Sequence, residues 1–418
     1  MDEGKKQRII LDCKYIILAI LVGIIVGIVD TIFGRVLIAV SNFRAEHYRI
    51  MLPFLPIAGL LIMEMYQRFS KLSLKGMTLI FQTGQNKRDS IPLALVPIQI
   101  LATWITNLFG GSAGREGVAV QIGATLSHAL GRRFQLPENG RIILVAGMAA
   151  GFSGLFQTPL AAIFFSMEVI VAGYLEYEAM LPTVIAAYTA CITSHVLGLH
   201  KFTAPLSETL DLTEVKNLIL ILVLGAIFGI VGRLFSFLLS RMKGIMAKKI
   251  KNPFLRIGIA SIPLAILLLV LHADRYSGVG TNLITDSFQN GTIYSYDWIL
   301  KLLLTVVTLS IGFQGGELTP LFAIGSSLGI VLGNLFGISP VICASLGYAA
   351  VFGSATNTLL APIMIGVEIF GTANMLPIIM VCIIAYIMNG NTSIYSAQQE
   401  AVGMYLQEYF GREKKNHE

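Results

Sequence analysis

Long apolar segments constrain the fold of this sequence more than any other feature. Of its 418 residues, 55% are apolar and only 13% are charged, a balance typical of membrane proteins. Eight segments are long enough to cross a bilayer core of roughly 30 Å, and they lie at about 14–40, 51–66, 91–109, 178–198, 215–239, 254–271, 298–313 and 374–388. None resembles a cleaved signal peptide. The pattern predicts an all-α polytopic membrane protein.

Shorter apolar stretches lie between these segments, and each is broken by glycine or proline. They are found at about 76–83, 116–131, 142–156, 158–173, 319–334, 340–353 and 359–371. We expect half-helices or tilted helices there. The 41 glycines suit close helix packing and chain breaks inside the membrane, where irregular backbone persists only if it lines a cavity.

The placement of charge predicts which segment ends face the cytoplasm. The positive-inside rule assigns both termini and the basic clusters to that side, namely Lys5–Arg8, Lys87–Arg88, Arg132–Arg141, Arg241–Lys251 and Arg412–Lys415. The acidic linker 201–214 and the loop Ser277–Asp297, which has no Lys or Arg, are expected outside. The net charge of +6 therefore indicates topology in a lipid bilayer rather than nucleic-acid binding.

The two halves of the chain match when the sequence is shifted by about 200 residues. Gly147–Phe152 lines up with Gly347–Phe352, and Gly114–Glu116 meets Gly315–Glu317 with one extra residue. Further matches in nearly the same register pair Leu160, Ala161, Ile163 and Glu168 with Leu360, Ala361, Ile363 and Glu368. Several matches at one offset indicate a duplication.

Charge also predicts that the two halves have opposite orientations. The joining loop Gly131–Arg141 is basic, whereas its repeat partner Gly333–Pro340 carries no charge. Equivalent loops should then lie on opposite sides, as in an inverted-topology repeat whose discontinuous helices meet near the bilayer midplane. The expected division is a first half at 1–200, an extracellular linker at 201–214, a second half at 215–390, and a last helix with cytoplasmic tail at 391–418.

One candidate site is the element Gly114-Arg115-Glu116-Gly117-Val118, directly before a helical stretch. A carboxylate at a helix N-terminus occupies the place that an anion would occupy. The flanking glycines let backbone N–H groups approach, so the carboxylate and a free anion can compete. Protonation removes the carboxylate from this competition, which would link proton movement to anion movement. The alternative is an ordinary helix-capping glutamate.

The repeat partner of this element is Gly315-Gly316-Glu317-Leu318-Thr319-Pro320. Thr319 is expected at the N-cap and Pro320 in the first helical turn, so that the hydroxyl and nearby N–H groups face an anion. Glu317 is either a second titrating group or a residue that favours the helix start. Both glutamates would be costly at membrane depth without a function, which argues against a non-transporting scaffold.

Motifs of other functional classes are not found in the sequence. It contains no HExxH, zinc-ligand spacing, Walker loop, GxSxG element or dinucleotide fingerprint, and its four cysteines form no CxxC pair. We therefore expect no metal, no cofactor and no enzymatic activity. An intramembrane protease is a further alternative, but the chain lacks a paired Asp-Asp or Ser-His arrangement at membrane depth.

The chain resembles the CLC family of chloride channels and proton-coupled anion exchangers over nearly its whole length. The resemblance rests on Gly114-Arg115-Glu116-Gly117, on Val120-Gln121-Ile122-Gly123, on the segment Gly151–Glu168 and on the inverted repeat. It implies a homodimer with one pore per subunit in a bacterial inner membrane. It also implies that Tyr395, after the break Asn389-Gly390-Asn391, is an inner-gate residue; the alternative for Tyr395 is an interfacial aromatic belt residue.

Departures from the common chloride pattern resemble a bacterial branch that expels fluoride. The serine that coordinates chloride in the Gly-Ser-Gly-Ile-Pro element is replaced by Met77, the residue after Gly117 is Val118 rather than proline, and Val169 stands where exchangers carry a proton-relay glutamate. The implied function is proton-coupled fluoride export; the alternative is a chloride/proton exchanger or chloride channel. The expected gating or proton-carrying residues are Glu116 and Glu317, and the expected anion-binding residues are Gly114, Arg115, Gly117, Val118, Met77, Leu318, Thr319 and Tyr395.

Overall fold

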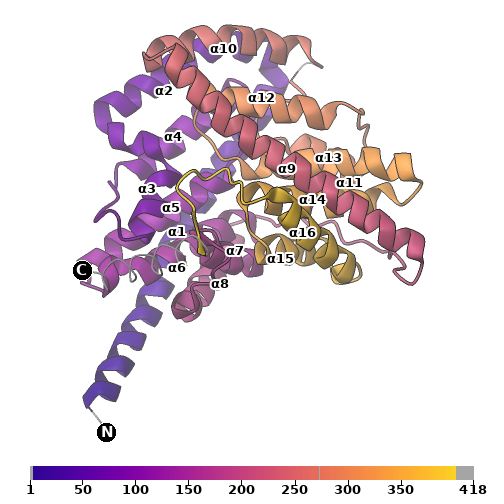
Figure 1. Ribbon diagram of the computed structural model, residues 1–418. Coiled ribbons are helices and arrows are strands. Elements are labelled where there is room, and N and C mark those ends of the chain that lie inside the picture. The colour runs from indigo at the N-terminus through magenta and orange to yellow at the C-terminus, as the bar shows by residue number, and fades with distance from the viewer. Residues whose placement is uncertain (1–2, 273, 402–418) are drawn as a thin grey trace, which may run out of the picture.

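The computed structural model describes residues 3–272 and 274–401, and these are mostly helical (Figure 1). The first half contains α1 (Glu3–Met51), η1 (Leu52–Phe54), α2 (Leu55–Phe69), η2 (Lys71–Lys75), α3 (Met77–Gly84), α4 (Leu95–Leu108), α5 (Glu116–Arg133), η3 (Glu138–Gly140), α6 (Arg141–Phe156), α7 (Pro159–Glu168), β1 (Val171–Ala172), η4 (Tyr177–Ala179) and α8 (Met180–Val196). The second half contains α9 (Val215–Lys249), α10 (Pro253–Val270), α11 (Thr281–Phe288), α12 (Asp297–Ile311), α13 (Leu318–Phe336), α14 (Pro340–Thr356), α15 (Leu360–Phe370), α16 (Met375–Asn389) and β2 (Gln399–Glu400).

The duplication is confirmed by the order and length of the helices. Helices α3 and α11 each have 8 residues, α4 and α12 have 14 and 15, α5 and α13 have 18 and 19, and α6 and α14 have 16 and 17. Helix α11 forms inside the segment Ser277–Asp297, which the sequence analysis described only as a loop. It forms because Leu283 and Ile284 bury against the core, as the partner helix α3 does in the first half.

Two glutamates join the halves by capping each other's helices. The Glu168 carboxylate, at the end of α7, accepts hydrogen bonds from the N–H groups of Leu360 and Ala361 at 3.1 and 2.8 Å. The Glu368 carboxylate, near the end of α15, accepts from Leu160 and Ala161 at 3.1 and 2.9 Å. First-turn N–H groups have no partner within their own helix, so each half satisfies the donors of the other.

Close helix contacts inside each half depend on glycine. A Cβ atom added to Gly123 of α5 would lie 2.0 Å from the Gly147 carbonyl oxygen of α6. In the second half, a Cβ added to Gly325 of α13 would lie 2.1 Å from the Gly347 carbonyl oxygen of α14. Packing at this distance is the small-residue contact expected between membrane helices.

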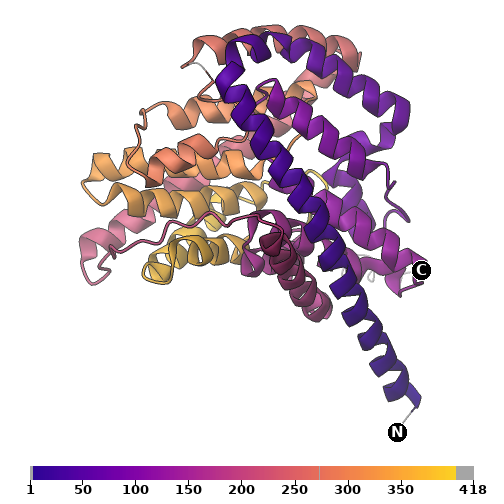
Figure 2. The same cartoon turned by 180° about the vertical axis from the view of Figure 1, so that it is seen from behind.

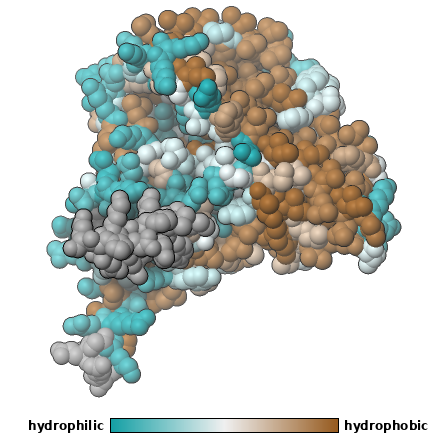
Figure 3. Space-filling model, in the orientation of Figure 1, coloured by the Kyte–Doolittle hydropathy of each residue, from teal (hydrophilic) through white to brown (hydrophobic). Residues whose placement is uncertain are grey.

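Five helical stretches within the described residues are long and apolar enough to cross a membrane. They are Gln7–Phe69, Tyr177–Val196, Val215–Lys249, Pro253–Val270 and Leu318–Phe336. Three segments expected to cross fully, at 91–109, 298–313 and 374–388, form the shorter helices α4, α12 and α16. Apolar side chains cover much of the outer surface, in brown in Figure 3, as required of a multi-pass membrane protein.

The ends and the linker frame this helical body. Seen from behind, α1 runs from an N-terminal end that projects below the body to its top (Figure 2). The linker 201–214 is not helical, and the N–H groups of Ala204 and Leu206 donate to the carbonyls of Ile369 and Phe370 at 3.1 Å each. Residues 391–400 contain β2, which pairs in parallel with β1, but no helix; residues 402–418 of the expected last helix and tail lie outside the described residues.

Candidate functional site

Two glycine-rich loops from opposite halves cross at the centre of the molecule. The Gly114 N–H donates to the Gly316 carbonyl at 2.6 Å, and the Gly316 N–H donates back to the Gly114 carbonyl at 2.8 Å. This antiparallel bridge brings the start of α5 next to the start of α13. The convergence of two helix N-termini, expected from the repeat, is therefore present in the structure.

Glu116, the first residue of α5, is completely buried. Its carboxylate accepts a hydrogen bond from the Thr319 hydroxyl, which belongs to the other half. It also accepts from the backbone N–H and the Nε of Arg115, at 3.4 Å each. The side chain thus spans the junction of the two halves, and charge-assisted hydrogen bonds hold it there.

The backbone nitrogens around Glu116 lie close to Gly316 of the other half. A Cβ added to Gly316 would lie 2.9 Å from the nitrogen of Gly117, and 3.2 and 3.3 Å from those of Arg115 and Glu116. Only glycine leaves this space open. Three successive backbone nitrogens thus lie close together at the start of α5, and the Arg115 N–H among them already donates to the Glu116 carboxylate.

Helix α13 begins two residues earlier than an N-cap at Thr319 would place it. Glu317 is the N-cap residue, and Thr319 and Pro320 lie in the first turn, so the expected N-cap position of Thr319 is wrong. The physical reason is that the Thr319 hydroxyl bonds to Glu116 across the junction instead of to its own backbone. The hydroxyl still lies at the helix start, facing the opposite half.

A cavity of about 400 Å³ opens beside this junction. Met77, Glu317 and Tyr395 line it, whereas the other expected site residues lie behind its wall. The Glu317 carboxylate faces this space and forms an ion pair with the Lys243 Nζ of α9 at 3.8 Å. Of the two glutamates, Glu317 therefore lines a cavity large enough for water and ions, and Glu116 does not.

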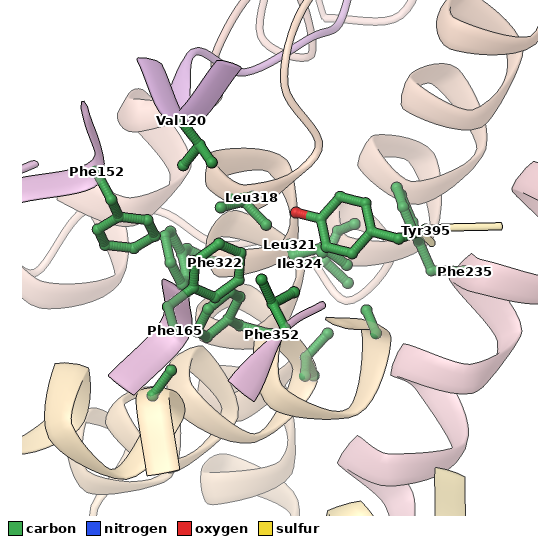
Figure 4. Close-up of a cluster of buried hydrophobic side chains, with 14 of the residues drawn as sticks. Val120, Phe152, Phe165, Phe235, Leu318, Leu321, Phe322, Ile324, Phe352 and Tyr395 are labelled. Atoms are coloured by element: carbon green, nitrogen blue, oxygen red, sulfur yellow. The ribbon is translucent and has the colours of Figure 1, made fainter. Parts of the chain in front are cut away.

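Tyr395 lies after the expected chain break. Helix α16 ends at Asn389, and Gly390 and Asn391 both adopt positive φ, at 62° and 59°. The Tyr395 ring packs 5.1 Å from that of Phe81, and its hydroxyl points toward Leu318 at the start of α13 (Figure 4). Phe81 was not among the site residues predicted from the sequence, and the structure adds it through its contact with Tyr395.

A short strap, residues 391–400, holds Tyr395 in place. The Gln398 Nε2 donates to the carbonyls of Val169 and Thr356 at 2.9 and 3.0 Å, and the Gln85 Nε2 donates to that of Ala397 at 2.7 Å. These bonds tie the strap to the C-terminal ends of α3, α7 and α14. No sequence pattern indicated these contacts, because they join residues that are far apart along the chain.

Two expected anion-binding residues are already engaged through their N–H groups. That of Gly114 forms the bridge to Gly316, and that of Val118 donates to the Arg115 carbonyl at 3.0 Å. Leu318 is buried at the start of α13, in the cluster of side chains toward which the Tyr395 hydroxyl points (Figure 4). The site thus gathers all the expected residues, but they divide into a buried junction and a cavity wall.

The fold and the site define a membrane protein in which broken helices of two inverted halves meet at a buried carboxylate, that of Glu116. The family model described as "Voltage gated chloride channel" matches residues 58–390. A "Chloride/fluoride channel protein" of Pseudomonas syringae pv. tomato is 33% identical over 393 residues, which cover 92% of this chain and 86% of that protein. The chain therefore belongs to the voltage-gated chloride channel family, known as CLC.

Solved structures agree with this assignment. The crystal structure of a CLC-type fluoride/proton antiporter superposes with a TM-score of 0.92 and 49% identity, covering 93% of this chain and 98% of that one. A slow cyanobacterial Cl⁻/H⁺ antiporter shares the fold, with a TM-score of 0.79, 20% identity and coverage of 91% and 96%. An H(+)/Cl(−) exchange transporter of Vibrio cholerae is 26% identical over 418 residues, covering 91% and 87%.

Proposed function

We propose that this chain exchanges fluoride for protons and exports fluoride from the cytoplasm, with Glu116 as the gate. The observation that carries the proposal is the buried Glu116 carboxylate, which lies across the junction of the two helix starts and is bound by Thr319. A relative named for fluoride/proton antiport, at 49% identity, supports fluoride as the substrate.

The exchange follows from competition at the junction. When ionised, the Glu116 carboxylate accepts the hydrogen bond of the Thr319 hydroxyl and occupies the position that an anion would occupy. A proton neutralises it and weakens these bonds, so that the side chain can leave and a fluoride ion can take the donors. Because the same position holds either the carboxylate or the anion, proton and fluoride movements become linked.

Orientation and assembly belong to the same proposal. The cavity with Lys75, Lys243 and Arg256 opens to the cytoplasm, because basic residues mark that side. Both termini lie on the cytoplasmic side, and the acidic linker 201–214 lies outside, between the two halves 1–200 and 215–390. The protein is a homodimer in a bacterial cell membrane, with one pore in each subunit.

The test is transport by the purified protein in liposomes, with fluoride efflux and proton uptake recorded at the same time. Fluoride leaving and protons entering both make the interior positive, so valinomycin and K⁺ are added to carry the compensating charge. We then expect fluoride efflux to drive protons in the opposite direction. Fluoride efflux without proton movement would indicate a channel. Transport of chloride in preference to fluoride would favour the chloride/proton exchanger that shares this fold.

A further inference from the structure

The cavity beside Glu317 carries an excess of positive charge. Three basic side chains line it, Lys75 of η2, Lys243 of α9 and Arg256 of α10, against the single carboxylate of Glu317. Such a surface raises the local concentration of anions. Long, flexible cations attract an anion at a distance, but they do not by themselves replace the water that a small anion must lose.

Polar atoms that can replace this water are present deeper in the same cavity. Gln121 Oε1, Ser310 Oγ and Tyr395 Oη are buried, and none has a hydrogen-bond partner among the residues that the structure describes. The three residues expose only 5%, 4% and 6% of their surface, and all line the cavity. Buried polar side chains in proteins almost always have a partner, so these three groups are free to bond an ion or molecule that enters the cavity.

Neighbouring side chains of the same kinds do find partners. On α12 the Thr308 hydroxyl donates to the Leu304 carbonyl at 2.7 Å, the usual bond for a hydroxyl inside a helix, whereas Ser310 makes no such bond. Gln99 also lines the cavity, but its Oε1 accepts a hydrogen bond from the Tyr66 hydroxyl. Within the cavity, the unpartnered groups thus differ from bonded neighbours of the same kind.

Gln121, a residue of α5, contacts Gly76, which directly precedes Met77 at the start of α3. A Cβ added to Gly76, which has φ 46°, would lie 3.1 Å from Gln121 Oε1, so glycine makes room for the carboxamide. The Gln121 carboxamide can turn about its last torsion and present its NH₂ group. The Met77 thioether, in contrast, offers no donor to an anion.

We propose that Gln121 and Ser310 donate hydrogen bonds to a partly dehydrated fluoride ion in this cavity, before the ion passes Met77. The inference rests on the proposed fluoride transport and adds the residues that accept the ion first. The donor that is missing at Met77 is supplied from α5 by Gln121 and from α12 by Ser310. Fluoride is a small, strongly hydrated anion, so it gains more from these donors than chloride does.

The test compares Gln121→Leu and Ser310→Ala with wild type in the liposome assay, at increasing internal fluoride concentrations. A hydrogen bond to a charged group is lost in each variant, so we expect the half-saturating fluoride concentration to rise about tenfold. The maximal rate should stay close to that of wild type, because Glu116 and Thr319 are unchanged. Isothermal titration of the detergent-solubilised protein with sodium fluoride should show the same loss of affinity.

Ser327→Ala is the matched control for Ser310→Ala. Its hydroxyl donates to the Ala323 carbonyl at 2.5 Å, and it does not line the cavity, so its half-saturating concentration should equal that of wild type. If Gln121→Leu does not yield folded protein, the titration of Gln121→Asn and Ser310→Ala decides the question.

Three results are distinguishable. Unchanged half-saturation in a wild-type protein that does exchange fluoride for protons would overturn the inference and leave water as the occupant of the cavity. A fall in maximal rate with unchanged half-saturation would also overturn it. A wild-type protein that does not transport fluoride would overturn the proposed function, and this inference with it.

Discussion

The start of α5 and the start of α13 are equivalent by duplication, but they present their glutamates differently. The Glu116 carboxylate is fully buried and bonded to a residue of the other half. The Glu317 side chain is 14% exposed, faces the cavity, and pairs with Lys243, whose side chain is 47% exposed. One glutamate is held at the junction, and the other is directed toward solvent.

A single pair of residues explains this difference. In the repeat register Thr319 corresponds to Val118, so only one half carries a hydroxyl that can reach across the junction. Thr319 binds Glu116, whereas Val118 has nothing to donate to Glu317. The duplication gives the two halves equivalent glutamates. The residue on the opposing helix, Thr319 for Glu116 and Val118 for Glu317, makes their hydrogen bonding different.

Glu116→Gln should have the largest effect on this arrangement. The variant keeps the size of the side chain but fixes it in a neutral form, so it cannot exchange a proton. We expect proton-coupled fluoride transport to fall to the level of liposomes without protein, while the elution profile and thermal stability stay those of wild type. Unchanged coupled transport would remove Glu116 from the mechanism.

Met77→Ser probes the cavity side of the comparison. It restores a hydroxyl donor at the start of α3, where the common chloride pattern has one. The chloride-to-fluoride permeability ratio should rise about tenfold, the value of one hydrogen bond to a charged group. Ion-selective electrodes give both fluxes from the same liposomes, and a ratio that does not move would contradict the idea.

Thr319→Val makes the two helix starts alike. The Glu116 carboxylate then loses its partner from the other half, and we expect several-fold slower coupled transport because the carboxylate is no longer held at the junction. Thr103→Val on α4 is a control, since its buried hydroxyl donates to the Gln99 carbonyl of its own helix at 2.7 Å and not to Glu116. Equal rates for Thr319→Val and wild type would show that the asymmetry at the junction has no functional role.

Glu317→Gln should have a smaller effect, which is limited to the number of protons transported per fluoride ion. Glu317 faces the cavity and pairs with Lys243, so it can pass protons between the cavity and the junction. We expect fewer protons per fluoride ion, with fluoride transport partly retained. A proton-to-fluoride ratio equal to that of wild type would show that Glu317 has no role in proton transfer and serves only as the N-cap residue of α13.

The junction could be predicted from the sequence because the two halves repeat the same glycine-glutamate element. The side-chain partners of the two glutamates could not be predicted, because they are not part of the repeat. Matching glycine-glutamate elements at one offset placed Glu116 and Glu317 together without any knowledge of packing. The partners of these carboxylates, Thr319 for one and Lys243 for the other, depend on how side chains turn once the halves meet. No spacing within a single element encodes that choice.

Local patterns misled in two places for physical reasons. Thr319 carries the usual N-cap side chain, yet its hydroxyl is used across the junction, so the helix begins at Leu318. The apolar run of helix α11, centred on Leu283 and Ile284, is too short to predict a helix from the sequence, and it becomes helical because these residues are buried in the core. In both cases a tertiary contact overrides the local preference.

The smallest effect is expected for Val169→Ala, the counterpart of the Glu317 variant. Val169 lies at the end of α7, and its side chain cannot titrate. By the resemblance described above, chloride/proton exchangers carry a proton-relay glutamate at this position. The Val169 carbonyl holds Gln398 at 2.9 Å, and that bond does not depend on the side chain. The fluoride-to-proton ratio should therefore stay that of wild type, while the loss of buried methyl groups costs about 1 kcal/mol or more of stability. If Val169→Ala changes the ratio and Glu317→Gln does not, protons pass along α7, and the pairing of Glu116 with Glu317 across the repeat is wrong as a proton route.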